Sequence, residues 1–280
     1  MMTTPIFGAT AQPDECRLYT LRNASGMAVT ISERGAALRS WHAPDRYGRM
    51  ADVVLAEPDH ASSASPAARW QGRHAEGGVS LLLTAPGGAE LLVNYHLDDD
   101  GSLIINYKAT AAAPVALDVQ LRPYFNLNGG HADVGDHMLQ IDAAYFVEVD
   151  AGGAPAGVAA VGGTPFDFRQ PAPIGPRLRW SGTQTRLMGG FNHCLFVRDH
   201  YAGGQGALRE VARVVDPGSG RRLQMYTTEA ALQLCTGQRA GFCLEAHARP
   251  CLMSAAWPQV VLRRGQVYRQ TTVYRLALEA

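Results

Sequence analysis

The sequence predicts an all-β fold built as a large antiparallel β-sandwich. Many short runs alternate apolar and polar residues, which is the pattern of half-buried strands. The 280 residues include 30 Gly and 16 Pro, enough to supply the turns that many short strands require. No segment shows the apolar periodicity of an amphipathic helix. Strand patterns continue without an interdomain linker, so we expect one domain over residues 1–280.

Turn residues divide the first half of the chain into strands. Asn23-Ala24-Ser25-Gly26 is a turn cluster. Asp98-Asp99-Asp100-Gly101 predicts a hairpin loop because Gly tolerates a positive φ. Pro123 has no N–H to donate, so we expect the chain to turn out of the sheet at its rim there. The expected strands are 17–21, 27–32, 79–84, 91–97, 103–109 and 115–121.

The second half follows the same pattern, with a hairpin signal at Pro217-Gly218-Ser219-Gly220. Two stretches resist interpretation as strands. We expect residues 59–68, rich in Ala, Ser and Pro, to form an exposed loop. Residues 152–179 predict a long ordered excursion across a sheet. The expected strands are 208–215, 222–228, 232–236, 241–246, 259–262 and 268–276.

Composition excludes several classes of function. Lys plus Arg and Asp plus Glu each number 25, for a formal net charge of zero, so neither a nucleic acid nor an anionic membrane is an expected partner. The same balance gives no argument for a protein partner. Five cysteines without a CxxC pair indicate neither a disulfide framework nor a zinc ribbon. With no signal peptide and no apolar run of transmembrane length, we expect a cytoplasmic protein with reduced thiols.

The segment 241–247 is the most informative for chemistry. In a strand, residues two apart share a face, so Cys243, Glu245 and His247 would lie together. If that face lines a cleft, Glu245 can act as a general base and His247 can donate or relay a proton. The alternative is an exposed face on which both side chains are simply solvated.

Two further segments carry polar side chains that are candidates for contact with a ligand. Arg122 precedes Pro123 and so would sit at the rim, where it meets a polar ligand or covers apolar surface with its stem. Asn192 and His193 begin another expected loop-to-strand segment. No P-loop, GxGxxG, HExxH or GxSxG motif is present. We expect no metal and no organic cofactor.

Several short motifs follow one another along the chain, and in this order they resemble the aldose 1-epimerase (galactose mutarotase) family. The most specific is Gly241-Phe242-Cys243-Leu244-Glu245. The resemblance covers most of the chain from residue 27. It implies a β-supersandwich with a sugar-binding cleft. The other matching stretches are 27–36, 52–55, 123–127, 190–193, 219–237 and 262–268.

The resemblance also implies a mechanism, in which a Glu removes the anomeric hydroxyl proton while a His protonates the ring oxygen. Glu245 falls on that base. The family's His aligns with Arg122, which is always charged and cannot cycle a proton. We expect Arg122 to keep a catalytic role by stabilising negative charge on oxygen through hydrogen bonding. The family's sugar-binding Asp aligns with Asn192, and a Gln of the family aligns with His247. The longer piece that the family carries between Leu55 and Trp70 is largely missing, and His60 stands where its second His would be, with His74 a less close stand-in.

Three functions follow as alternatives. The first is an aldose 1-epimerase acting on a sugar or sugar-like small molecule, with Glu245 as base. The second is a different isomerisation or cyclisation of a non-sugar metabolite on the same scaffold. The third is a catalytically inactive carbohydrate-binding protein. In the first, His247, His193 or His60 supplies the proton, and the residues expected to hold the substrate are Arg122, Asn192, His193, Gln233, Tyr124 and His60.

Overall fold

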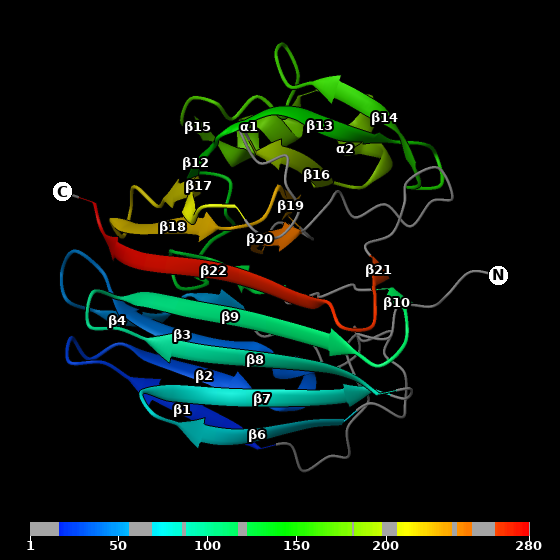
Figure 1. Cartoon of the computed structure of the whole chain (residues 1–280). Helices are drawn as coiled ribbons and strands as arrows, with labels where there is room; N and C mark the ends of the chain where they lie inside the picture. Colours follow the sequence, from blue (N-terminus) through cyan, green and yellow to red (C-terminus); the bar gives the residue numbers. More distant parts are fainter. Residues whose placement is uncertain are drawn as a thin grey trace.

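Antiparallel strands make up most of the regular structure in the computed structural model (Figure 1). It describes residues 17–55, 69–85, 88–116, 122–180, 182–197, 206–236, 240–247 and 261–279. The expected all-β class is confirmed. Parts of two expected strands, 117–121 and 259–260, lie outside the described residues, as does the whole of the expected loop 59–68.

The largest sheet has nine strands in the order β15-β12-β17-β18-β22-β9-β8-β7-β6. Alternation explains its one-sided burial: along β8, Leu91, Val93 and Tyr95 are buried while Glu90 and His96 face outward. The hairpin expected at 98–101 joins β8 to β9. The strands are β6 (Arg69–Ala75), β7 (Gly78–Ala85), β8 (Ala89–Leu97), β9 (Ser102–Ala111), β12 (Met138–Ile141), β15 (Ala172–Pro173), β17 (Arg209–Val215), β18 (Arg221–Thr227) and β22 (Val267–Leu278).

A second sheet has seven strands in the order β14-β13-β16-β19-β20-β11-β5. Our expectation that the chain leaves the sheet at Pro123 is wrong, because the next two residues form β11 and pair with β20 and β5. Proline can precede a strand whose ladder begins after it. The strands are β5 (Val54–Leu55), β11 (Tyr124–Phe125), β13 (Ala143–Val149), β14 (Pro155–Ala160), β16 (Asn192–Val197), β19 (Ala231–Cys235) and β20 (Phe242–His247).

Two smaller sheets and three short helices complete the described structure. The four-stranded sheet holds β1 (Leu18–Arg22), β2 (Ala28–Ser32), β3 (Leu38–Pro44) and β4 (Met50–Asp52), and the two-stranded sheet holds β10 (Val115–Ala116) and β21 (Val261–Leu262). The helices are η1 (Arg34–Ala36), α1 (Ile174–Arg179) and α2 (Thr183–Leu187). None of the described helices is long and apolar enough to span a membrane. The expected excursion over 152–179 contains β14, β15 and α1.

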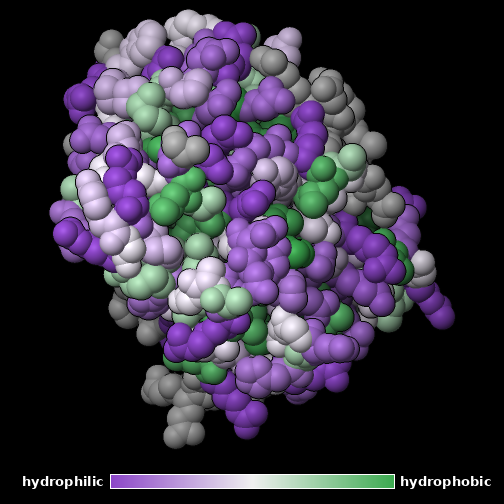
Figure 2. All heavy atoms as spheres, turned by 90° about the vertical axis from the view of Figure 1, so that its left-hand side faces the viewer, coloured by the Kyte–Doolittle hydropathy of each residue, from purple (hydrophilic) through white to green (hydrophobic). Residues whose placement is uncertain are grey.

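The core lies between the sheets. In the seven-stranded sheet, Phe125 and Phe242 turn their rings inward, and the Phe125 ring lies 5.3 Å from that of Tyr274 in the nine-stranded sheet. The Tyr95 hydroxyl donates to the carbonyl oxygen of Ala36, which ties β8 to η1. Polar residues cover most of the face shown in Figure 2, and apolar residues form only small patches there. In β19 and β20 every second residue joins this core, and the residues between them form a polar face on the other side.

Candidate active site

Register brings most of the predicted polar residues to one face of the seven-stranded sheet. Glu245 of β20 lies directly opposite Gln233 of β19. Asn192 of β16 lies opposite Cys235, and Tyr124 of β11 lies opposite Cys243. Opposite residues of an antiparallel pair point to the same side, and so do residues two apart in one strand. These side chains and that of His247 therefore share a face.

Glu245 is the centre of this polar face. Its side chain is 3% exposed, so the alternative of a solvated surface is wrong. Arg122 donates from Nε to Oε2 of Glu245 at 2.9 Å, and Nε2 of His247 lies 3.4 Å from the same oxygen. The other oxygen, Oε1, is buried and has no hydrogen-bond partner. One carboxylate oxygen is thus held in place while the other remains an available acceptor.

The charges around Glu245 keep it ionised. Burial alone would raise the pKa of the carboxyl, but the charge of His247, followed by the charge and hydrogen bond of Arg122, outweighs burial and lowers it. Glu245 in turn raises the pKa of Arg122 against the opposing effect of burial. The Arg122 side chain is 37% exposed, so it lies between the buried carboxylate and solvent.

A hydrogen-bonded amide pair extends the site from β19 to β16. Gln233 donates from Nε2 to Oδ1 of Asn192 at 2.9 Å. The Cys235 thiol donates to the same oxygen at 3.2 Å. Asn192 is half-buried, and Gln233 is 8% exposed. Two neutral amides beside a carboxylate form a set of hydrogen-bonding groups suited to a polyhydroxylated ligand.

His193 does not join this group. It lies opposite Leu234 and points into the core, where its ring packs against Phe146 and Phe166. Nδ1 accepts from the backbone N–H of Asn192, and Nε2 lies 3.3 Å from Oε1 of Gln184. Burial lowers the pKa of His193 to about 4, so the ring is neutral near pH 7. Asn192 and His193 are consecutive in a strand, and one of them must therefore face away from the site.

His60 lies outside the described residues. The sequence interpretation missed the ion pair between Arg122 and Glu245 and the contacts of Cys235. No local spacing signals these contacts, because they join segments that are far apart along the chain. Among the residues that the structure describes, no group of three or more His, Cys, Asp or Glu side chains could hold a metal ion.

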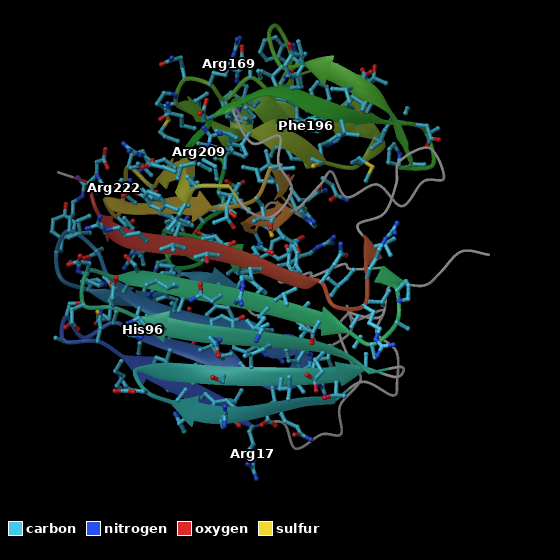
Figure 3. All side chains as sticks on the ribbon, viewed as in Figure 1. Arg17, His96, Arg169, Phe196, Arg209 and Arg222 are labelled. Atoms are coloured by element: carbon cyan, nitrogen blue, oxygen red, sulfur yellow. The ribbon has the colours of Figure 1, made fainter. Side chains whose placement is uncertain are left out.

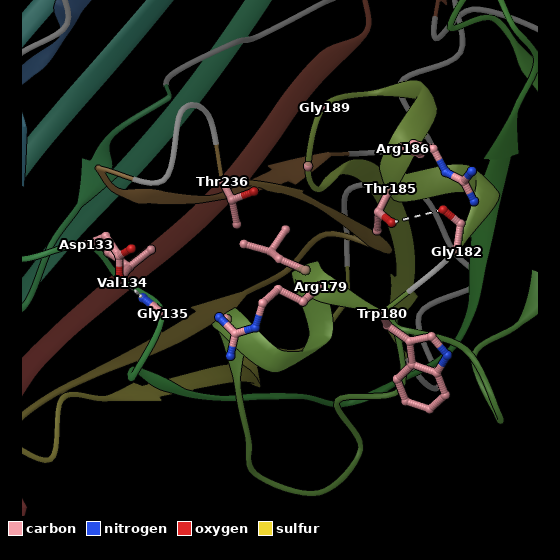
Figure 4. Close-up of a pocket in the computed structure, with 13 residues that line it drawn as sticks. Asp133, Val134, Gly135, Arg179, Trp180, Gly182, Thr185, Arg186, Gly189 and Thr236 are labelled. Carbon is pink, nitrogen blue, oxygen red and sulfur yellow. Dashed lines mark hydrogen bonds between the residues drawn. The ribbon is translucent and has the colours of Figure 1, made fainter.

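A cavity of about 430 Å³ opens at the ends of β16 and β19 (Figure 4). Gly190 and Thr236 line it beside Arg179 and Trp180 of the α1 region, whereas Glu245 does not. We place the candidate active site at Glu245 rather than in this cavity, because the paired carboxylate, imidazole and guanidinium are there. The cavity adjoins the strand ends that carry Asn192 and Cys235.

Comparisons with known proteins show the family to which this chain belongs. The family model described as Aldose 1-epimerase matches residues 68–275. Galactose mutarotase of Bos taurus is 32% identical over 235 residues, which cover 75% of this chain and 66% of that protein. The chain thus spans just under two thirds of that relative. Aldose 1-epimerase of Escherichia coli (strain K12) is 29% identical over a 349-residue alignment that covers 99% of both chains.

The fold has a solved counterpart. A GalM/aldose epimerase homologue from C. elegans superposes with a TM-score of 0.80 at 21% identity, covering 95% of this chain and 100% of that one. The expected mutarotase-like sandwich is confirmed. The E. coli alignment is longer than this 280-residue chain, so it contains gaps on this side. The chain belongs to the aldose 1-epimerase family.

Proposed function

We propose that this chain interconverts the anomers of an aldose, with Glu245 as the general base. The observation that carries the proposal is the state of its carboxylate. Oε2 is held by the hydrogen bond from Arg122, with Nε2 of His247 3.4 Å away, while the buried Oε1 has no partner. An ionised oxygen that is free to accept a proton is what removal of an anomeric hydroxyl proton requires.

In the proposed reaction, Oε1 of Glu245 takes the proton of the anomeric hydroxyl, and the bond between the anomeric carbon and the ring oxygen breaks. His247 gives a proton to the ring oxygen. The open aldehyde rotates, and the ring closes on its other face as both protons return. The two reacting oxygens are bonded to one carbon, so acid and base must be close neighbours. His247 and Glu245 meet this condition, with Nε2 and Oε2 3.4 Å apart.

Arg122 supports this reaction without exchanging a proton. Its guanidinium stays charged near neutral pH, so it stabilises negative charge that develops on the ring oxygen. Asn192, Gln233 and Tyr124 share the face of Glu245, and we assign them to binding the sugar hydroxyls.

Anomer exchange of glucose and galactose, followed by NMR, tests the proposal. We expect the wild-type protein to accelerate exchange and Glu245→Gln to lose about 10²–10⁴-fold of the rate. The matched control is Glu210→Gln, which removes a carboxylate that pairs with Arg213 in β17 and should leave the rate unchanged. No acceleration by concentrated wild-type protein would contradict the proposal for these sugars.

A second candidate is sugar binding without turnover. It is favoured by Arg122, which replaces a proton-cycling His and lowers the pKa of the base. Arg122→Met separates the two candidates. If Glu245 is a working base, its pKa rises in this variant, and the acid limb of the pH–rate profile moves to higher pH.

Arg213→Met is the matched control for Arg122→Met. Arg213 makes an ion pair of the same 2.9 Å length with Glu210 at a similar exposure, and its loss should not move the profile. A binding protein would instead show no rate in any variant, and only the affinity for sugar would change.

A further inference from the structure

Two cysteines lie directly opposite each other beside Glu245. Cys235 of β19 pairs with Cys243 of β20, two residues along the ladder from the pair of Gln233 and Glu245 and on the same face. Both are free thiols and both are buried. The two side chains hydrogen-bond each other.

This placement suits a disulfide. Opposite residues of an antiparallel pair have Cα atoms about 4.5–5.5 Å apart. Disulfides accept Cα separations of about 4.4–6.8 Å. Because the two cysteines are already opposite each other, a bond between their sulfur atoms requires rotation of the side chains and no change in strand register.

The two thiols are chemically unequal. The hydrogen bond from Cys243 and the charge of Arg122 lower the pKa of Cys235, although burial acts in the opposite direction. The hydrogen bond to Cys235 and burial raise the pKa of Cys243. An easily ionised thiol beside a protonated one is the arrangement of an attacking and a resolving cysteine. The charge of Arg122, whose side chain is partly exposed, reaches Cys235.

We propose that Cys235 and Cys243 form a reversible disulfide when a peroxide reaches the site. The Cys235 thiolate attacks one peroxide oxygen, the O–O bond breaks, and the released hydroxide takes up the proton that Cys235 has lost. The sulfenic acid left on Cys235 is attacked by the sulfur of Cys243. The S–S bond forms and a second water leaves. Two thiols are oxidised and one peroxide is reduced to two waters.

The disulfide also alters the neighbouring amide pair. Reduced Cys235 donates to Oδ1 of Asn192, which also accepts from Gln233. A disulfide sulfur has no proton, so this donation is lost and Oδ1 of Asn192 keeps only the hydrogen bond from Gln233. This last step rests on the proposed function: oxidation should weaken sugar binding and raise KM by roughly fivefold, the effect of losing one hydrogen bond.

The experiment exposes the full-length protein to graded hydrogen peroxide and maps disulfides by mass spectrometry after digestion without reduction. We expect a peptide that links residues 235 and 243, with a loss of two hydrogens, and its reversal by dithiothreitol. Cys235→Ser and Cys243→Ala should each abolish it. Cys194→Ser is the matched control and should retain it, because Cys194 lies opposite Gln233 rather than another cysteine.

The outcomes separate this inference from the proposed function. Oxidation of Cys235 to sulfinic acid without a link to Cys243 would overturn the proposal of a disulfide. A link that forms in wild-type protein without changing KM would overturn its coupling to the site. If no anomer exchange is found at all, the proposed function fails while the mapped link still decides the disulfide.

Discussion

At the scale of single residues, the ion pair between Arg122 and Glu245 sets what the site can do. A guanidinium holds the carboxylate ionised and in one orientation, and it gives up its own proton to neither substrate nor solvent. Any proton that the reaction needs must therefore come from elsewhere. In the proposed function it comes from His247, whose Nε2 lies 3.4 Å from Oε2 of Glu245.

Glu229 is a second buried carboxyl, and its pKa is shifted in the opposite direction from that of Glu245. Its side chain is fully buried. Oε1 accepts from the Tyr268 hydroxyl at 2.8 Å, while Oε2 has no partner. Burial raises the pKa of Glu229 from 4.5 to about 7, against smaller opposing effects of Tyr268 and His247. The folded protein therefore binds this proton more tightly than the unfolded chain does.

This difference predicts how stability depends on pH. Between pH 4.5 and about 7 the folded state holds more protons at Glu229, so the free energy of unfolding falls as pH rises through this window and levels off above it. The fall should be on the order of 3 kcal/mol. Glu229→Gln should remove it in urea unfolding at a series of pH values. Glu210→Gln should keep this pH dependence, because the pKa of Glu210 is lowered and the group titrates below this window.

At the scale of elements, local alternation was sufficient to predict β20 and its two faces. Cys243, Glu245 and His247 share the polar face, and Phe242 and Leu244 join the core, as the pattern indicates. The short β11 was not predictable in this way, because two residues show no periodicity and its place depends on pairing with β5 and β20. The same holds for the opposed cysteines, since register between separate strands is a tertiary property.

The start of β20 depends on a close approach that only glycine allows. A Cβ on Gly241 would lie 2.8 Å from Cδ1 of Leu55 and 2.9 Å from the carbonyl oxygen of Phe125. Gly241→Ala should cost about 1–3 kcal/mol of stability, because the backbone contact cannot yield easily. It should also slow anomer exchange by displacing the strand that carries Glu245.

Gly157→Ala is the matched control for this glycine. It lies in the edge strand β14, and its Cβ would meet only the end of the Glu148 side chain, at 3.4 Å. Urea unfolding should show a lower free energy of unfolding for Gly241→Ala and an unchanged one for Gly157→Ala. Equal midpoints would contradict the argument that β20 is fixed by this approach.

At the scale of the whole molecule, one buried arginine joins parts of three sheets. Arg221 begins β18 of the nine-stranded sheet and is 2% exposed. Its Nη1 donates to the carbonyl oxygen of Leu127 at 2.8 Å, in the segment just after β11. Its Nη2 donates to the carbonyl oxygens of Ala43 and Arg49 at 3.2 and 3.0 Å, in and beside the four-stranded sheet. Each carbonyl would lose its charged donor if Arg221 were removed.

Arg221→Met should therefore destabilise the protein by roughly 3–5 kcal/mol, because three hydrogen bonds from a charged donor are lost. Arg221→Lys should not restore the loss, since an ammonium cannot reach three carbonyls in the fork geometry of a guanidinium. Arg222→Met is the control: Arg222, labelled in Figure 3, pairs with the half-exposed Glu279, and its removal should cost under about 1 kcal/mol.

If residues 1–280 form one domain, as the continuous strand pattern predicts, all these proteins unfold in one transition. Two separate transitions, with only one of them moved by Arg221→Met, would contradict that prediction and would divide the sheets into independent units.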